Sequence, residues 1–484
     1  MVSCTVEKSS IPYDIIAKVG ERIITKQNMI HRSEYTLRPL YCRESNYIHK
    51  KIILNSLIAE KLFSFEAEKN KIDLLDNIRF HTFITGRTEQ TMRQMHYYEE
   101  FYKQVELDSS VISSSYKLAG RTVDVTYLHL PDLNIAAQIK DLSEGGLPLD
   151  SAYAMIWDDS RSPKRQINWF DREGAELHRA IFNPNIKKGS IIGPLTTENN
   201  THLLIQVNGW TDRPAVTDSE ISLRVNDVRE RLQENHAEQK YKNWVKYIMK
   251  GKHLELNPSV YPTYAERVMN IYLKSDSIKQ AQLNLSLWVE PEYDLLLDSL
   301  KKIPKDNFTE DDILFHVDNV PWTIKVFHQK LSQHPLVFRK KKISHSQFQE
   351  QLKYAIADLI QNIEITKYCY SKGYDKSYTV TLNKELWYDA YTAHSYRNNL
   401  LEEQNMLNSD AESIAKALNS IVDSLQNIYS DQIKIDTDLF ESIELTNIDM
   451  TVFQHGVPFP KVVPPFPVYT SDNRLDYGQK RNFR

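Results

Sequence analysis

The stretch TVDVTYLHL, residues 122–130, alternates in polarity and is rich in β-branched residues, so it predicts a β-strand near the middle of the chain. The stretch THLLIQV at 201–207 has the same character. Between them, residues 134–142 are predicted to form a helix that ends before a Gly-Gly pair, and GSIIGP at 189–194 is predicted to form a turn. We therefore expect residues 121–213 to fold as one small α+β domain.

Both flanks of this domain are predicted to be helical. Apolar residues from Ile53 to Phe65 fall on one face of a helix. On the other side, TDSE at 217–220 matches a capping box, in which Thr217 bonds the N3 amide and Glu220 reaches back to the cap. We expect this second helix to continue as far as Tyr247. The sequence thus predicts an α+β protein with a mostly helical body and one inserted α+β domain.

An internal repeat suggests that the helical body contains two related modules. VDNVPWT at 317–323 echoes VGERIIT at 19–25, and the apolar spacing after Leu359 matches that after Leu57. The last stretch, from Val457, holds five prolines among aromatic residues and is predicted to be extended. The predicted divisions are a helical module at 10–120, the α+β domain at 121–213, a helical segment at 214–292, a second helical module at 293–430 and an extended Pro-rich tail at 431–484.

Composition excludes several classes of function. The chain of 484 residues carries 60 Lys and Arg against 64 Asp and Glu, so its near-neutral charge gives no reason to expect binding to nucleic acid. Its glycines number 13 and form no phosphate-binding motif. Its three cysteines form no C-x-x-C pair, and no H-E-x-x-H occurs, so we expect no metal and no cofactor. No apolar run is as long as a membrane span.

Several motifs resemble a known family. IAKVGERIIT at 16–25, followed by LIAEKL at 57–62, resembles the N-terminal chaperone module of the SurA/PrsA-like periplasmic foldases. The central domain resembles a parvulin-type (PpiC-like) peptidyl-prolyl isomerase, with matches at NWF (168–170), AIF (180–182), GSIIGP (189–194) and THLL (201–204) in the family's order. The resemblance covers about residues 10–255 and, more loosely, 310–400.

The resemblance implies a site for twisting an X–Pro amide, whose rotation barrier is about 18–20 kcal/mol. The family uses two strand histidines and a Cys or Asp beside an apolar pocket for the proline ring. The implied catalytic positions are His202 as the second histidine, Tyr127 at the first histidine position with His129 two residues along the same face, and Asp158 or Asp159 as the acidic group. The implied substrate-binding residues are Trp169, Phe170, Leu177 and Phe182.

Two substitutions indicate an eroded active site. Glu173 stands where the family has a Met, and Leu177 stands where it has a Phe. A charged Glu173 in a proline pocket would cost several kcal/mol of desolvation unless it points outward. Ordinary structural roles also stay open, because a strand histidine such as His202 is commonly a packing residue and Asp158-Asp159 alone is typical of a polar turn. The Trp169-Phe170 pair is equally typical of a core.

The favoured interpretation is a periplasmic chaperone that binds unfolded or exported proteins and whose isomerase activity is weak or lost. An active isomerase that uses His129, Asp158 and His202 is one alternative. A structural subunit of an export or outer-membrane machine, docked through the Pro-rich tail, is another. Cys4 is a candidate lipidation site and would be the only membrane contact; a free thiol at the chain end is the competing interpretation.

Overall fold

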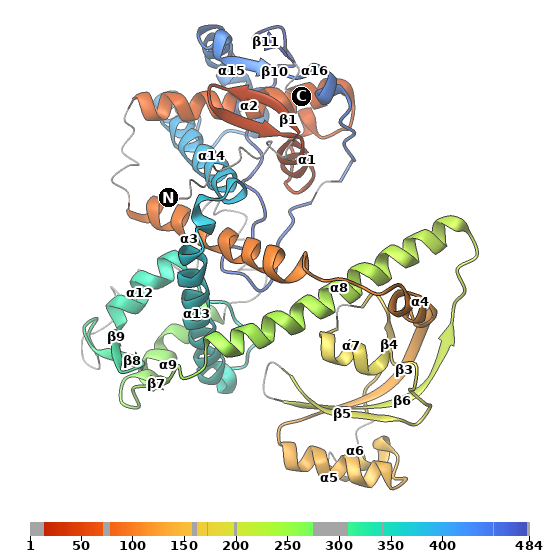
Figure 1. Cartoon of the computed structure of the whole chain (residues 1–484). Helices are drawn as coiled ribbons and strands as arrows, with labels where there is room; N and C mark the ends of the chain where they lie inside the picture. Colours follow the sequence, from red (N-terminus) through yellow and green to blue (C-terminus); the bar gives the residue numbers. More distant parts are fainter. Residues whose placement is uncertain are drawn as a thin grey trace, which may run out of the picture.

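The computed structural model describes residues 14–70, 78–156, 162–171, 173–197, 201–273, 308–340, 342–448 and 450–481. The chain is an α+β protein, as predicted, in which a helical body and a smaller α+β domain are joined by the long helix α8 (Figure 1). Three of the predicted site residues, Cys4, Asp158 and Asp159, lie outside the described residues. Among those described, no helix is both long and apolar enough to cross a bilayer.

A four-stranded antiparallel sheet forms the centre of the α+β domain. Its strands are β3 (Arg121–Leu130), β4 (Lys164–Asn168), β5 (Ile191–Thr196) and β6 (His202–Asp212), in the order β4-β3-β6-β5. Helices α5 (Leu133–Glu144) and α6 (Leu149–Ile156) pack on one face. On the other lie α4 (Ser109–Leu118), α7 (Ala175–Ile181) and α8 (Asp218–Ile248). The domain therefore buries a separate core on each face of its sheet.

The predicted strand at 122–130 and helix at 134–142 correspond to β3 and α5. The stretch 189–194, predicted to be a turn, instead enters strand β5 at Ile191. Gly193 lies inside that strand with a φ of 108°. A Cβ atom there would lie 2.3 Å from the carbonyl oxygen of Leu203, so only glycine fits where the two strands approach closely.

The body contains the same succession of elements twice. The first copy is β1 (Ile15–Val19), β2 (Arg22–Thr25), α1 (Lys26–Glu34), η1 (Leu40–Cys42) and α2 (Tyr47–Lys69); the second is β8 (Ile313–Val317), β9 (Val320–Thr323), α12 (Ile324–Gln333), η3 (His345–Gln347) and α13 (Phe348–Ser371). Each hairpin ends at a threonine whose hydroxyl caps the next helix. Thr25 accepts from the amide of Asn28 at 3.0 Å, and Thr323 accepts from that of Val326 at 3.3 Å. The repeated motif at 19–25 and 317–323 thus marks a repeated local structure.

The remaining elements of the body are α3 (Ile78–Tyr97), the π-helix η2 (Tyr98–Tyr102), β7 (Leu254–Leu256), α9 (Tyr261–Tyr272), η4 (Tyr374–Lys376), α14 (Tyr378–Glu403), α15 (Ala411–Ile428), η5 (Ser430–Gln432), β10 (Ile433–Ile435), α16 (Thr437–Glu441) and β11 (Gln479–Lys480). Strand β1 pairs with β10 as well as with β2, in the sheet order β11-β10-β1-β2. Side chains of α14, α15 and the last forty residues complete the core around α2. The core of the first module therefore also includes residues between 393 and 477.

Helix α8 connects the α+β domain with the body. Its capping box forms as predicted, with the Thr217 hydroxyl on the Glu220 amide and the Glu220 carboxylate on the Thr217 amide. The middle of the helix packs against α7, and its last two turns place Tyr241, Trp244, Val245 and Ile248 against α3, α13 and α14. A single 31-residue helix thus contacts both parts of the protein.

Candidate functional site

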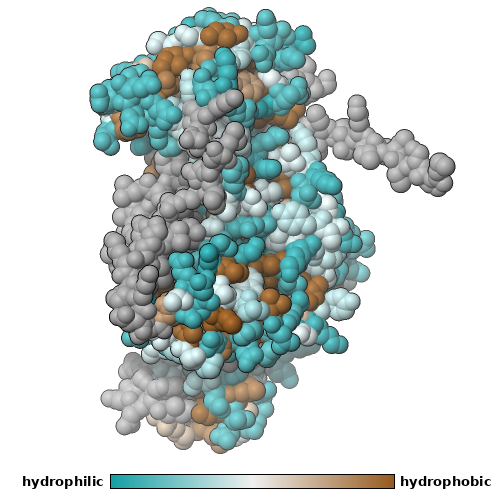
Figure 2. Space-filling view, turned by 90° about the vertical axis from the view of Figure 1, so that its left-hand side faces the viewer, coloured by the Kyte–Doolittle hydropathy of each residue, from teal (hydrophilic) through white to brown (hydrophobic). Residues whose placement is uncertain are grey.

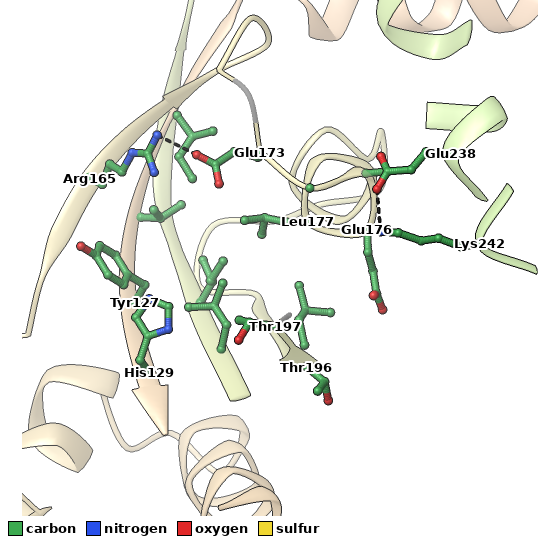
Figure 3. A pocket seen from close by; sticks show the side chains of 17 residues that line it. Tyr127, His129, Arg165, Glu173, Glu176, Leu177, Thr196, Thr197, Glu238 and Lys242 are labelled. Carbon is green, nitrogen blue, oxygen red and sulfur yellow. Dashed lines mark ion pairs between the residues drawn. The ribbon is translucent and has the colours of Figure 1, made fainter. Parts of the chain in front are cut away.

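A cavity of about 590 Å³ lies on the α7 side of the domain's sheet. Its walls come from β3, β4, β5, β6, the segment from Glu173 to Leu177, and α8 (Figure 3). Seven apolar side chains line it: Val125, Ile167, Ala175, Leu177, Leu195, Leu203 and Ile205. Nine polar or charged ones complete the lining: Tyr127, His129, Arg165, Glu173, Glu176, Thr196, Thr197, Glu238 and Lys242. A concave space that combines apolar side chains with hydrogen-bonding groups is suited to binding a ligand.

Strand alternation explains the apolar surface. Val125 on β3 pairs with Val207 on β6, and Tyr127 pairs with Ile205, so these residues share the α7 face of the sheet. Leu177 reaches the same space from α7, as Figure 3 shows. The sheet thus supplies a rigid base for the cavity.

Tyr127 and His129 lie together on the wall of the cavity, as their spacing predicts. They are two residues apart on β3, and their rings meet edge to face with centroids 5.7 Å apart (Figure 3). Partial burial lowers the pKa of His129 below its ordinary value, so its imidazole is neutral at pH 7. A neutral imidazole and a phenol are hydrogen-bonding groups suited to a peptide carbonyl or amide.

His202 faces the opposite side of the sheet. It pairs with Leu130, whereas His129 pairs with the next residue, Leu203. Paired residues in an antiparallel sheet share a face, and successive residues alternate, so His202 points toward α5 and α6. It is buried there, with Nδ1 3.2 Å from the Thr196 hydroxyl, and is not part of the cavity wall. The structure does not bring His129 and His202 together, because Leu203 occupies the cavity-facing position.

Glu173 does line the cavity, but it is paired. Its carboxylate lies 2.6 Å from the Arg165 guanidinium, and its carbonyl oxygen accepts a hydrogen bond from Arg231 of α8. The side chain of Glu173 is 16% exposed and that of Arg165 is 48% exposed. The ion pair and partial access to water offset the desolvation cost that the sequence implies. The pair is one polar wall of the cavity.

Of the four predicted substrate-binding residues, the cavity includes Leu177 alone. Trp169 and Phe182 are 2% and 6% exposed and pack against each other in the domain core, with ring centroids 5.1 Å apart. Phe170 is 55% exposed and lies outside the cavity wall. The motif residues around Trp169 therefore build the domain rather than touch a ligand in this cavity.

Sequence reasoning missed the contribution of α8. Glu238 and Lys242 are one helical turn apart, form an ion pair of 2.5 Å and line the cavity from the side opposite β3 (Figure 3). Their i, i+4 spacing is visible in the sequence, but it is equally typical of an exposed helix face. Only the packing of α8 across α7 turns this pair toward the cavity.

His178 links α7 by hydrogen bonds to the backbone at Trp169 and to α8. Its Nε2 lies 3.1 Å from the Trp169 carbonyl oxygen, and its Nδ1 lies 3.2 Å from the Asn235 amide nitrogen on α8. A neutral ring protonated at Nε2 donates the first bond and accepts the second. Burial, helped by the nearby Arg231 charge, lowers its pKa to about 4.

Acid is therefore expected to destabilise the α+β domain. Between pH 6.5 and 4 His178 binds a proton in the unfolded chain but stays neutral in the folded domain. The free energy of unfolding therefore decreases as the pH falls from 6.5 toward 4, by at most about 3 kcal/mol. The opening free energy of the amides in β3 and β6, obtained from hydrogen exchange at pH 7 and pH 4.5, measures this loss. The variant His178→Gln should show a smaller drop between the two pH values; an equal drop would contradict the assignment.

The described residues offer neither a metal site nor a reactive thiol. They contain no group of three or more His, Cys, Asp or Glu side chains placed to hold a metal ion. Cys42 and Cys369 are buried free thiols, and burial raises the pKa of each to about 12, so neither is a reactive thiolate. No family model matches the chain, and a search of curated proteins found no similar sequence.

Proposed function

We propose that the protein is a chaperone whose α+β domain binds extended polypeptide segments in the cavity between the sheet and α7. One observation carries the proposal: a cavity of about 590 Å³ combines apolar side chains of the sheet and α7 with hydrogen-bonding groups on its walls. A proline or aliphatic side chain would enter among Leu177, Leu203 and Ile205. The peptide backbone would then lie within reach of Tyr127 and His129.

Prolyl isomerisation in this domain is proposed to be weak or lost. The family that the sequence resembles uses two histidines on one face, beside the amide that twists. Here the cavity-facing positions carry Tyr127, His129 and Leu203, so one imidazole is present where two would be needed. Loss of a group that stabilises only the twisted amide lowers the rate without preventing binding.

The helical body is proposed to provide further contacts for unfolded or exported client proteins. Figure 2 views the side on which β8, β9 and α12 lie, and there hydrophobic residues form small groups among hydrophilic ones. Val320 on β9 is 59% exposed and Val326 on α12 is 39% exposed. These exposed side chains are proposed to add weak contacts to an unfolded chain that is bound at the cavity. A periplasmic location and a lipid anchor at Cys4 belong to the same proposal.

An active isomerase is the second candidate. Tyr127, His129 and Arg165 all lie on the cavity wall and could polarise an amide carbonyl or nitrogen. This reading assigns catalysis to residues on β3 and β4 and no role to His202.

A peptide assay separates these two functions. We expect tetrapeptides with a central X–Pro bond to bind the full-length protein, and a protease-coupled assay to show little or no acceleration of isomerisation. His202→Ala should bind like the wild type, because His202 faces away from the cavity. Leu177→Glu should bind at least tenfold more weakly, because it places a charge in the apolar space.

The outcomes are distinct. A clear rate that falls in His129→Ala but not in His202→Ala would establish the isomerase. Equal binding by Leu177→Glu and the wild type, with both proteins folded by circular dichroism, would refute the cavity as the binding site.

A further inference from the structure

We propose that the cavity selects peptide segments in which a Lys or Arg side chain neighbours the residue that enters it. This inference rests on the proposed function and adds the chemical class of its ligand. It is drawn from the distribution of charge around the cavity.

Two of the three carboxylates on the cavity wall are neutralised. Glu173 pairs with Arg165 at 2.6 Å, and Glu238 pairs with Lys242 at 2.5 Å. These pairs account for both Lys and Arg side chains of the lining. Glu176 forms no ion pair within the described ranges, so the wall of the cavity carries one uncompensated negative charge.

The nearest cationic side chain on α7, that of Arg179, does not form an ion pair with Glu176 in the described structure. Arg179 lies three residues later on α7, a spacing at which ion pairs commonly form. Its guanidinium instead donates to the Ala175 carbonyl oxygen at 3.2 Å and to the Gln239 amide oxygen at 2.9 Å. The two bonds direct Arg179 toward its own helix and α8, and leave the Glu176 carboxylate available.

Glu176 lies where a bound peptide would leave the cavity. Figure 3 shows its side chain extending beyond Leu177, on the side of Thr196 and Lys242. The residue is exposed, whereas the apolar side chains beside it are buried or half-buried. A ligand with an apolar group on Leu177 would therefore place the next side chain near this carboxylate.

Glu176 can stabilise its own helix and still attract a cation from a ligand. It lies in the first turn of α7, where a carboxylate is favourable to the helix dipole. That interaction leaves the carboxylate ionised and exposed, so it still attracts a cation. The neutral state of His129 also means that no positive imidazole competes at pH 7.

The test compares labelled Ala-Lys-Pro-Phe, Ala-Leu-Pro-Phe and Ala-Glu-Pro-Phe amides, and their counterparts with the charge after proline, binding to the full-length protein. In low salt the better-placed Lys peptide should bind about two- to fivefold more tightly than the Leu peptide, the range expected for an exposed ion pair. In high salt that advantage should disappear. Glu176→Gln should abolish the preference for the Lys peptide over the Leu peptide, and Glu176→Lys should favour the Glu peptide.

Glu144→Gln is the matched control, because it makes the same change in net charge on α5, across the sheet from the cavity. Equal affinity for Lys and Glu peptides would overturn this inference and leave the proposed function intact. The same holds if Glu144→Gln removes the preference as fully as Glu176→Gln. Failure to bind even the Leu peptide would overturn the proposed function itself, and this inference with it.

Discussion

A chain that ends at Gly456 is expected to lose the folded structure of its first module. The removed segment supplies five large side chains, apolar or aromatic, that are less than 8% exposed in the body: Phe459, Val463, Phe466, Tyr469 and Tyr477. Each buried side chain of this size contributes about 1.5–3 kcal/mol. Their sum is about 10 kcal/mol, which is comparable to the whole stability of a typical domain.

The same truncation removes hydrogen-bond partners of buried polar groups. Asn55 donates to the carbonyl oxygen of Asp472 at 2.8 Å, and Gln90 exchanges two bonds with the backbone of Phe459. Without the tail, these amides would be buried without partners or exposed to water, and either result destabilises α2 and α3.

The truncation is measured by hydrogen exchange and limited proteolysis. We expect loss of protection in β1, α2 and β10 and cleavage within α2. The α+β domain has its own two cores and should keep its protection, so it serves as an internal control. A truncated chain with wild-type protection in α2 would show that the tail is not needed for the stability of the first module.

Arg32→Met is expected to lower the free energy of unfolding of the same module by about 3–5 kcal/mol, the usual effect of breaking a buried ion pair. Arg32 is fully buried, and its guanidinium meets both oxygens of Glu60, at 3.0 and 2.7 Å. It also donates to the carbonyl oxygen of Pro465 at 2.7 Å. The substitution leaves Glu60 charged and buried without its partner.

Two further variants test this explanation. Arg32→Met combined with Glu60→Leu removes the stranded charge and should recover a large part of the loss. Lys416→Met breaks a pair of similar length, 2.7 Å, between side chains that are 65% and 54% exposed, and should cost less than about 1 kcal/mol. The opening free energy of α2 from hydrogen exchange gives all three values. A cost for Arg32→Met as small as that for Lys416→Met would refute the buried-pair argument.

Local patterns in the sequence predicted local structure well. The capping box at Thr217, the strand at 122–130 and the hairpin-helix motif shared by 19–25 and 317–323 depend on residues within a few positions of one another. Such short-range signals are present in the chain before it folds. The α+β class followed from them.

The parts that were missed depend on register and on contacts distant in sequence. Successive residues of a strand point to opposite faces of the sheet, so Leu203 faces the cavity and His202 faces away from it. Strand β6 also pairs irregularly with both of its neighbours. The tail has no periodicity that would indicate burial, because an extended Pro-rich segment packs wherever the rest of the body leaves space for it. The prediction of an extended segment was compatible with the structure, but its place in the core could not be read from composition.

The pairing of β1 with β10 sets the order in which the protein can mature. Synthesis delivers the N-terminus first, yet Ala17 pairs with Ile435, and Arg32 contacts Pro465, which lies 433 positions later in the sequence. The first module therefore cannot complete its core, and keeps apolar surface exposed, until residues near 465 have been synthesised. The central domain closes on local contacts and can finish earlier. During its own biogenesis the protein thus passes through a state like that of the unfolded chains it is proposed to bind.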